Sequence, residues 1–247
     1  MTILRRFFLQ LTGAAALSPL SSFFDCVQEQ SKVPPLVDQV PPMLDHILLG
    51  CNNLQRGIDF VEQHTGVRAA FGGVHPNRGT HNALLGLGTL RYLEIIAPDP
   101  KQQTDDPLAK RLQAMPQPKL ATWAAHSTDI SALAAKLKSV GIAAEGPTPG
   151  SRKPHDGQEL HWQTLGLKDD ANGLLPFFIE WSKSSVHPSE AAPKGCQLLK
   201  FEIVTPQPAT LAKLCSLIGL EVQISPGPVN QLRASIIGPK GKLELTS

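Results

Sequence analysis

Residues 72–99 combine polar side chains with strongly apolar strands. His75, His81 and Asn82 flank a glycine-rich turn, and Glu94 follows within the apolar run YLEIIA. A carboxylate in a buried strand needs a partner, because an unpaired charge is costly to remove from water. Histidine and glutamate in such a setting can bind a metal ion or move a proton.

The partner that we expect for Glu94 is His46, which lies in an earlier apolar segment. Side chains alternate along a strand, so Tyr92 shares a face with Glu94, and Leu44 shares a face with His46. If the two strands are neighbours, His46 and Glu94 meet. Glu180, in the run LLPFFIEWS, is expected to join them by the same logic. One imidazole and two carboxylates that converge in a cleft of low dielectric constant predict a divalent metal site.

Three segments with one layout would supply the strands that position these residues. Residues 43–54, 119–130 and 197–208 each read as a strand that ends in polar or proline residues. An amphipathic helix is expected after each strand, because apolar residues recur there with helical spacing. These helices are expected to end at glycines, namely Gly66, Gly141 and Gly219. Three strand-like stretches follow each helix, and the last stretch of each unit carries one glutamate: Glu94, Glu180 or Glu244.

The sequence therefore predicts an α+β fold built from repeated βαβββ units. Residues 43–100 and 117–183 form two units of a domain that spans residues 43–192, and residues 193–247 form a third unit. Residues 145–160 read as a loop that gives the second unit its extra length. A repeat of this size cannot close its own core, so neighbouring units must share one. Two units are expected to pair into a curved sheet that forms a cup, with the helices outside.

This layout resembles the vicinal oxygen chelate superfamily, which includes glyoxalase I, methylmalonyl-CoA epimerase, bleomycin-resistance proteins and extradiol dioxygenases. The segment LDHILLGCNNL resembles the first strand of that fold, and YLEIIAPD resembles the fourth. A finer motif is similar to the glyoxalase-like domain family, and it consists of His75-Pro76, Gly79-Thr80-His81-Asn82 and Tyr92-Leu93-Glu94. The resemblance covers residues 43–182, and only the layout repeats over residues 197–247.

The resemblance implies a set of metal ligands, because the first and last strands of each unit supply them in this superfamily. Three matching positions hold His46, Glu94 and Glu180, and the fourth holds Thr122, which is a poor ligand. Three protein ligands and a water molecule can still form a catalytic site. The departure at Thr122 equally fits a relative that has dropped the metal and binds an organic molecule.

Two classes of function follow from the resemblance. The first is a metal-dependent lyase, isomerase or epimerase, in which a divalent ion chelates vicinal oxygens of a small oxygen-rich substrate. Glu94 or Glu180 would then act as the catalytic group that carries the proton. The second is a non-catalytic protein that binds or sequesters a small molecule in the same cup.

Four residues are expected to contact the substrate or ligand. Asn82 offers an amide to a carbonyl or hydroxyl group, and His75 reaches the cup from the neighbouring turn. Tyr92 shares the face of the predicted ligands, and Trp162 aligns with Asn82 in the second unit. Arg152 is interpreted as a solvated residue, with the alternative that it belongs to a lid loop that recognises an anionic substrate.

The composition and the N-terminus indicate which partners and which cellular location to expect. The net charge is only +2 over 247 residues, with no basic run, so nucleic acid is not an expected partner. Residues 1–25 resemble a bacterial twin-arginine export signal, with Arg5-Arg6 before a short apolar stretch. We expect export to the periplasm, with an ordinary basic terminus and a cytoplasmic location as the alternative. Residues 26–42 read as a proline-rich linker, and no later segment is long enough to span a membrane.

The third unit raises a question of packing, because units of this kind pair. It carries Phe201 and Glu244 at the positions that would hold ligands, so it is interpreted as a structural copy. Its sheet would expose an apolar face that includes Phe201 and Leu243, and folded proteins avoid such exposure. The face either packs within the chain or pairs with a second copy around a two-fold axis. We expect the second arrangement, a homodimer through residues 193–247.

Overall fold

The computed structural model describes residues 39–76, 78–103, 105–152 and 159–247 of the chain. The predicted export signal and most of the predicted linker lie outside the described residues. Among the described residues, no helix combines the length and the apolar character needed to cross a membrane.

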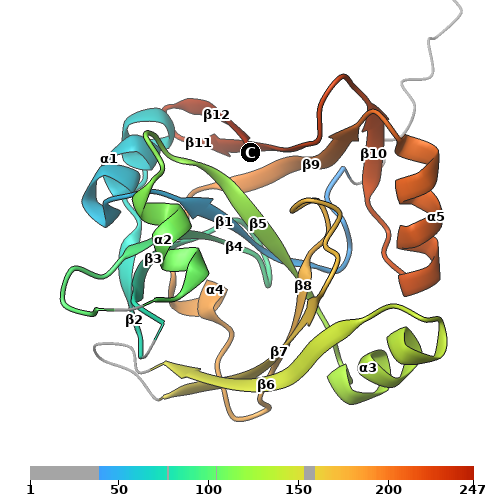
Figure 1. The fold of residues 1–247 in the computed structure, drawn as a ribbon. Helices are drawn as coiled ribbons and strands as arrows, with labels where there is room; N and C mark the ends of the chain where they lie inside the picture. Colours follow the sequence, from blue (N-terminus) through green and yellow to red (C-terminus); the bar gives the residue numbers. More distant parts are fainter. Residues whose placement is uncertain (1–38, 77, 104, 153–158) are drawn as a thin grey trace, which may run out of the picture. The chain divides into compact units, whose positions relative to one another are not determined.

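The order of strands and helices repeats three times, as the sequence predicts (Figure 1). The first unit contains β1 (Leu44–Gly50), α1 (Leu54–Thr65), β2 (Ala70–His75), β3 (Thr80–Gly86) and β4 (Tyr92–Pro98). The second contains β5 (Lys119–His126), α3 (Ile130–Ser139), β6 (Ala144–Arg152), β7 (Leu160–Leu167) and β8 (Phe177–Trp181). The third contains β9 (Gln197–Thr205), α5 (Pro208–Ile218), β10 (Gln223–Pro226), β11 (Gln231–Gly238) and β12 (Gly241–Thr246). Two short helices that were not predicted connect the units, α2 (Pro107–Gln113) and α4 (Pro188–Ala191).

Local sequence signals set the ends of the long helices. The Asn53 side chain accepts a hydrogen bond from the Arg56 amide at the start of α1, and Asp129 caps α3 in the same way. Gly66 and Gly219 follow α1 and α5 with φ angles of 80° and 79°. Glycine adopts this left-handed conformation without strain, so the helix ends predicted at Gly66 and Gly219 are confirmed. Helix α3 ends at Ser139, and Gly141, with a φ angle of 76°, follows its cap residue Val140.

Strands β1 to β8 form one eight-stranded sheet in the order β2-β3-β4-β1-β5-β8-β7-β6. Within each of the first two units, the first and last strands are parallel neighbours, β1 with β4 and β5 with β8. The two units join through the antiparallel pair β1 and β5. The sheet curls strongly, as Figure 1 shows, and its concave face forms the predicted cup.

Strand β6 corrects the first part of the prediction that residues 145–160 form a loop, and residues 153–158 lie outside the described residues. The structure places residues 144–152 in this strand, at the edge of the sheet beyond β7. Pro147 and Pro149 cannot donate backbone hydrogen bonds, and proline is tolerated in a strand chiefly at such an edge.

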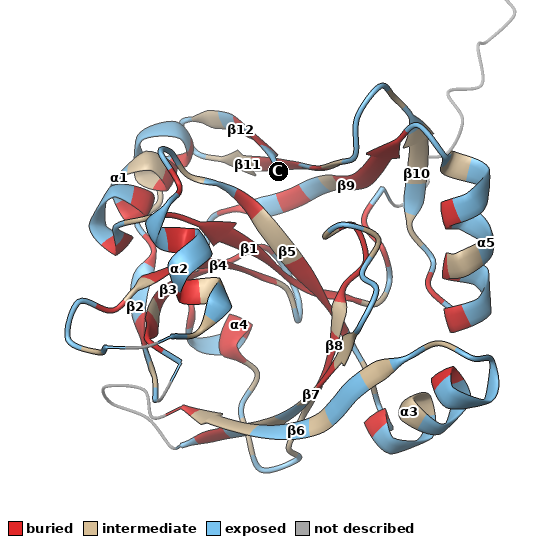
Figure 2. Ribbon diagram, in the orientation of Figure 1, coloured by how far each residue is buried: buried red, intermediate tan, exposed pale blue. Residues whose placement is uncertain are grey.

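The convex face of the sheet carries the main hydrophobic core. Helices α1 and α3 pack against it, and so does the C-terminal unit. Trp123 of β5 and Phe201 of β9 are fully buried where the two sheets meet, with ring centroids 4.9 Å apart. Figure 2 shows buried residues concentrated in the central strands β1, β4 and β5, whereas β6 is largely exposed.

The C-terminal unit corrects one expectation and does not support another. Its strands lie in the order β10-β9-β11-β12, so its first strand does not neighbour its last strand, as it does in the other two units. It is therefore not a structural copy of them. Its apolar face is buried within this chain, since Phe201, Ile203 and Leu243 belong to the shared core. The face therefore packs within the chain, which is the alternative that the sequence left open, and the homodimer through residues 193–247 stays a prediction that this face does not support.

The two connecting helices lie against the concave face, whereas the sequence predicted helices outside the cup only. Leu112 of α2 packs with Leu48 and Ile96, and Ala192, which follows α4, packs with Tyr92. These contacts fill both flanks of the cup. A polar cluster remains between them.

Candidate functional site

The polar cluster centres on His46 and Glu94, which the sequence predicted to meet. Parallel pairing of β1 with β4 aligns His46 with Tyr92 and Leu48 with Glu94, so both polar side chains lie on the concave face. The Nε2 atom of His46 lies 3.5 Å from Oε2 of Glu94. Both residues are buried, with 2% and 7% of their surface exposed. An imidazole and a carboxylate so placed can share or transfer a proton.

Asp45 orients the His46 ring from the other side. The Nδ1–H group of His46 donates to Oδ1 of Asp45 over 2.7 Å, although neighbours in a strand normally face opposite ways. The pairing of β1 with β5 shifts register between Leu44 and His46, so Asp45 is the extra residue of a β-bulge. The bulge turns Asp45 toward the concave side. With the proton on Nδ1, the Nε2 atom of His46 is the one that faces Glu94.

The second oxygen of Asp45 also accepts hydrogen bonds. Trp181 Nε1 and His187 Nε2 both reach Oδ2, over 3.0 Å and 3.2 Å. The Ser189 amide donates to His187 Nδ1, so the proton of His187 lies on Nε2. Burial alone would raise the pKa of Asp45, but the hydrogen bonds from His187 and His46 lower it well below the ordinary value of 3.8. Asp45 is therefore an ionised anchor for two imidazoles and an indole.

This anchor predicts a pH dependence of stability. A carboxyl whose pKa is lowered by folding stabilises the fold above its unfolded pKa, and this stability is lost as the pH falls through its folded pKa. The free energy of unfolding should therefore fall below about pH 4, the pKa range of an unfolded aspartate. Asp45→Asn should lower stability at neutral pH by about 1–3 kcal/mol, because buried donors lose their charged acceptor.

Urea unfolding at a series of pH values measures both effects. Asp59→Asn, at a side chain that is 58% exposed, is the matched control and should behave like the parent. An Asp45→Asn variant with the parent's stability and pH dependence would contradict the assigned role of Asp45.

Two residues that the sequence predicted to contact the substrate, Asn82 and His75, lie beside Oε1 of Glu94. Asn82 Nδ2 donates to Oε1 over 2.6 Å, and His75 Nε2 lies 3.7 Å from the same oxygen. Thr80 Oγ1 fixes the other nitrogen of His75 at 2.9 Å. Burial raises the pKa of Glu94, but His75, His46 and the Asn82 hydrogen bond more than offset this and lower it. Burial lowers the pKa of His75. At neutral pH the site therefore presents a carboxylate beside an uncharged His75.

Arg152 belongs to this cluster, which corrects its interpretation as a solvated residue. It is 4% exposed, and its Nη1 donates to Oδ1 of Asn82 over 3.0 Å. The contact joins β6, at one end of the curled sheet, to β3 near the other end. A Cβ atom at Gly72 of β2 would lie 2.4 Å from both Arg152 Nη1 and Asn82 Oδ1, so only glycine leaves room for this contact.

Glu180 does not join the cluster, contrary to the prediction. Its Oε2 accepts a hydrogen bond of 2.6 Å from the Ile130 amide at the start of α3. On β8, Phe177 and Trp181 are the residues that face inward, toward His46 and Asp45. Glu180 alternates with them and lies on the convex side. Its role is to cap a helix of the second unit.

The residues present do not complete the metal site that the sequence predicted. The second unit places Thr122 and Ala124 opposite Leu48 and His46, and neither is a metal ligand of the predicted kind. Within the described ranges, His, Cys, Asp and Glu side chains form no cluster of three arranged to hold a metal ion. His46 and Glu94 alone fall short of the three protein ligands of a catalytic centre.

Aromatic rings wall the cluster. The ring of Tyr92 stacks on His46 with centroids 4.5 Å apart. The ring of Trp162 packs against that of Trp181, with centroids 5.4 Å apart. The structure thus brings His75, Asn82 and Tyr92 beside His46 and Glu94, and it places Trp162 next to Trp181.

Sequence reasoning missed Asp45 and His187 as members of the cluster. Asp45 directly precedes His46, so proximity in sequence was a signal, but strict alternation argued against it. His187 lies in a segment between the second and third units, and no periodic pattern pointed to it.

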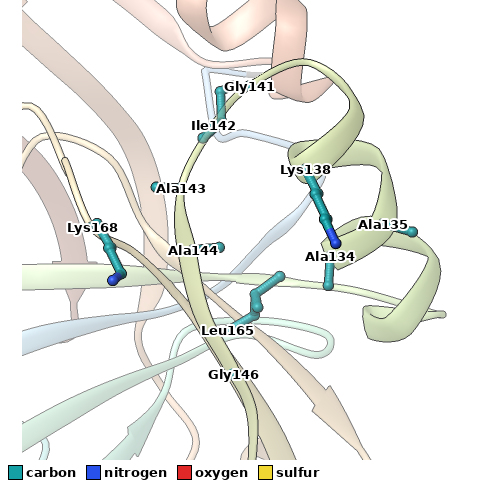
Figure 3. Close-up of a pocket in the computed structure, with 10 residues that line it drawn as sticks. All are labelled: Ala134, Ala135, Lys138, Gly141, Ile142, Ala143, Ala144, Gly146, Leu165 and Lys168. Atoms are coloured by element: carbon teal, nitrogen blue, oxygen red, sulfur yellow. The ribbon is translucent and has the colours of Figure 1, made fainter.

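A separate depression lies on the outside of the second unit, as Figure 3 shows. It is lined by α3, by β6 and β7, and by the segment that joins α3 to β6. Its charged groups are Lys138 and Lys168, and it includes no member of the polar cluster. We therefore assign the site to the cluster within the cup.

Comparisons with known proteins agree with this architecture. The model of a family described as "Glyoxalase-like domain" matches residues 44–218. No curated protein matches the sequence. A hypothetical protein from Staphylococcus aureus superposes with a TM-score of 0.56 at 17% identity, covering 82% of this chain and 84% of that one.

Methylmalonyl-CoA epimerases superpose over a shorter range. The enzyme from Mycobacterium tuberculosis gives a TM-score of 0.44 at 21% identity, covering 58% of this chain and 91% of its own. A variant of the Streptomyces coelicolor enzyme, in complex with 2-nitronate-propionyl-CoA, gives 0.44 at 20% identity, covering 57% and 98%.

Proposed function

Because the chain belongs to the glyoxalase-like domain family of the vicinal oxygen chelate superfamily, we propose that it is an enzyme that moves a proton on a small oxygen-rich substrate. One observation carries the proposal. Glu94 is a buried carboxylate with one oxygen fixed by Asn82 and the other turned toward His46, which Asp45 holds in place. Buried acid–base pairs with such support are typical of catalytic sites.

The geometry supports proton abstraction from carbon next to a carbonyl group. Glu94 Oε2 accepts the proton, and the electron pair of the C–H bond passes to the carbonyl oxygen as an enolate. The proton then returns from Glu94 to a neighbouring atom of the enolate, which completes an isomerisation. In an elimination, the enolate instead expels a leaving group from the adjacent carbon, and this group takes the proton from Glu94. His46 Nε2 stands beside this oxygen and can exchange the proton with it. We assign no step to a metal ion, because the donor set does not fit the three-ligand centre.

Solvent exchange tests the proposal without knowledge of the natural substrate. The protein is incubated in D₂O with a panel of small 2-hydroxy acids, 2-oxo acids and hydroxyketones, and proton NMR follows deuterium uptake next to the carbonyl. We expect uptake above the uncatalysed rate for at least one compound class. Glu180→Gln, which changes a carboxylate outside the cluster, is the matched control and should retain this rate.

The exchange assay also separates the alternative function. A binding or sequestering protein would hold a compound without exchange, and Thr122 in place of a ligand favours that alternative. Parallel samples with a chelator and with added Mn²⁺, Co²⁺, Ni²⁺ or Zn²⁺ measure any metal requirement. Saturable binding with no exchange in any sample would overturn the enzymatic proposal.

A further inference from the structure

Among the described residues, Arg152 is a buried arginine that has no anionic partner. Only 4% of the residue is exposed, and its hydrogen bond within this part of the chain goes to the neutral amide oxygen of Asn82. No carboxylate of the described ranges lies within 4.0 Å of it. Arginine carries five N–H donors, so one bond to Asn82 uses a small part of its donor capacity. A buried charge usually has a paired partner, because its desolvation is costly.

The position of Arg152 ties it to the reacting groups. Asn82 links it to Glu94, since the amide accepts from Arg152 and donates to the carboxylate. The positive charge also helps to lower the pKa of Glu94, behind the contributions of the two histidines and Asn82. Arg152 is thus one amide away from the proposed proton acceptor, and it approaches from the second unit.

We propose that Arg152 binds the anionic group of the substrate, and that this group is a carboxylate next to the carbon that Glu94 deprotonates. The inference rests on the proposed function and names its substrate class, a small 2-hydroxy acid. The planar guanidinium matches a carboxylate through two parallel hydrogen bonds. A single arginine beside the negative charge of Glu94 suits one negative charge better than the two of a phosphate.

Matched probes test the anion subsite directly. Glycolate and glycolamide differ only in that one carries a carboxylate and the other a neutral amide, and inorganic phosphate is the third probe. Thermal unfolding at constant ionic strength reports binding, because a ligand of the folded state raises Tm with concentration. We expect glycolate to raise Tm, and glycolamide to have no effect.

Variants of arginine identify the group responsible. Arg152→Gln should weaken glycolate binding by about 10-fold or more, as expected for a lost charged hydrogen-bond pair. Arg152→Lys keeps the positive charge but loses the planar pair of N–H donors, so it should bind glycolate with intermediate affinity. It also provides a second variant in case Arg152→Gln fails to fold. Arg233→Gln, at an exposed arginine of the third unit, should bind glycolate like the parent.

Each contrary outcome has a defined meaning. Equal Tm shifts with glycolate and glycolamide, or unchanged glycolate affinity in folded Arg152→Gln, would overturn the subsite. A shift with phosphate but none with glycolate would overturn the carboxylate assignment. Arg152-dependent glycolate binding without deuterium exchange would leave the subsite standing and overturn the proposed reaction. Deuterium exchange that does not depend on Arg152 would leave the proposed reaction standing and overturn the subsite.

Discussion

Glu94→Gln should lower the rate of deuterium exchange by about 10²–10⁴-fold, the usual contribution of a positioned acid–base group. Glutamine keeps the shape of the side chain, and its Oε1 can still accept the Asn82 hydrogen bond, so the cup should stay folded. What is lost is the proton acceptor beside His46. The measurement compares initial exchange rates by NMR with the best compound of the panel.

Two observations complete this test. The circular dichroism spectrum of Glu94→Gln should match that of the parent, which separates lost chemistry from lost structure. The exchange rate of the parent should fall as the pH drops below the ordinary pKa range of glutamate, about 4.3, because the lowered pKa of Glu94 keeps it ionised above that range. A Glu94→Gln variant that exchanges at the parental rate would remove Glu94 from the mechanism.

Phe201→Ala should destabilise the protein by about 3–5 kcal/mol, the usual cost of deleting a buried aromatic ring. Phe201 is fully buried, and its ring lies 4.9 Å from that of Trp123 at the junction of the two sheets. Its removal should open a cavity between the eight-stranded sheet and the C-terminal unit. The free energy of unfolding in urea measures this loss.

Leu199→Ala is the matched control on the same strand. Leu199 is 41% exposed, so its truncation should change stability by less than about 0.5 kcal/mol. If Phe201→Ala were as mild as Leu199→Ala, the C-terminal unit would not share the core of the other two units.

The pair of His46 and Glu94 could be predicted because it depends on two robust rules. Alternation fixes which side chains share a face of each strand, and parallel pairing of the first and last strands follows from the βαβββ layout. The same rules separate Asn82, which faces the cup, from His81, which packs against Phe71 elsewhere.

Glu180 could not be placed from sequence because FFIEW is apolar on both faces. When a strand is buried on both sides, alternation leaves two equivalent choices, and a shift of one residue exchanges the faces. The sequence match that aligned Glu180 with Glu94 assigned Glu180 to the wrong face of the strand. The structure instead places Phe177 and Trp181 in the cup.

The positions of Asp45 and Arg152 in the cluster could not be predicted for other physical reasons. A β-bulge adds one residue to a strand and interrupts alternation, and nothing in the local sequence LDHILLG announces it. Arg152 follows a segment rich in proline and glycine that resembles a loop, yet forms an edge strand. The C-terminal unit shows a further limit, because one order of elements is compatible with more than one order of strands.

The one-sided origin of the acid–base groups has a stereochemical consequence. Asp45, His46 and Glu94 all come from the first unit, whereas the second unit faces them with Phe177 and Trp181. A planar enolate between these walls would meet a proton donor on one face and aromatic carbon on the other. Protonation would then produce a single enantiomer, and the site would be ill suited to racemisation, which needs donors on both faces.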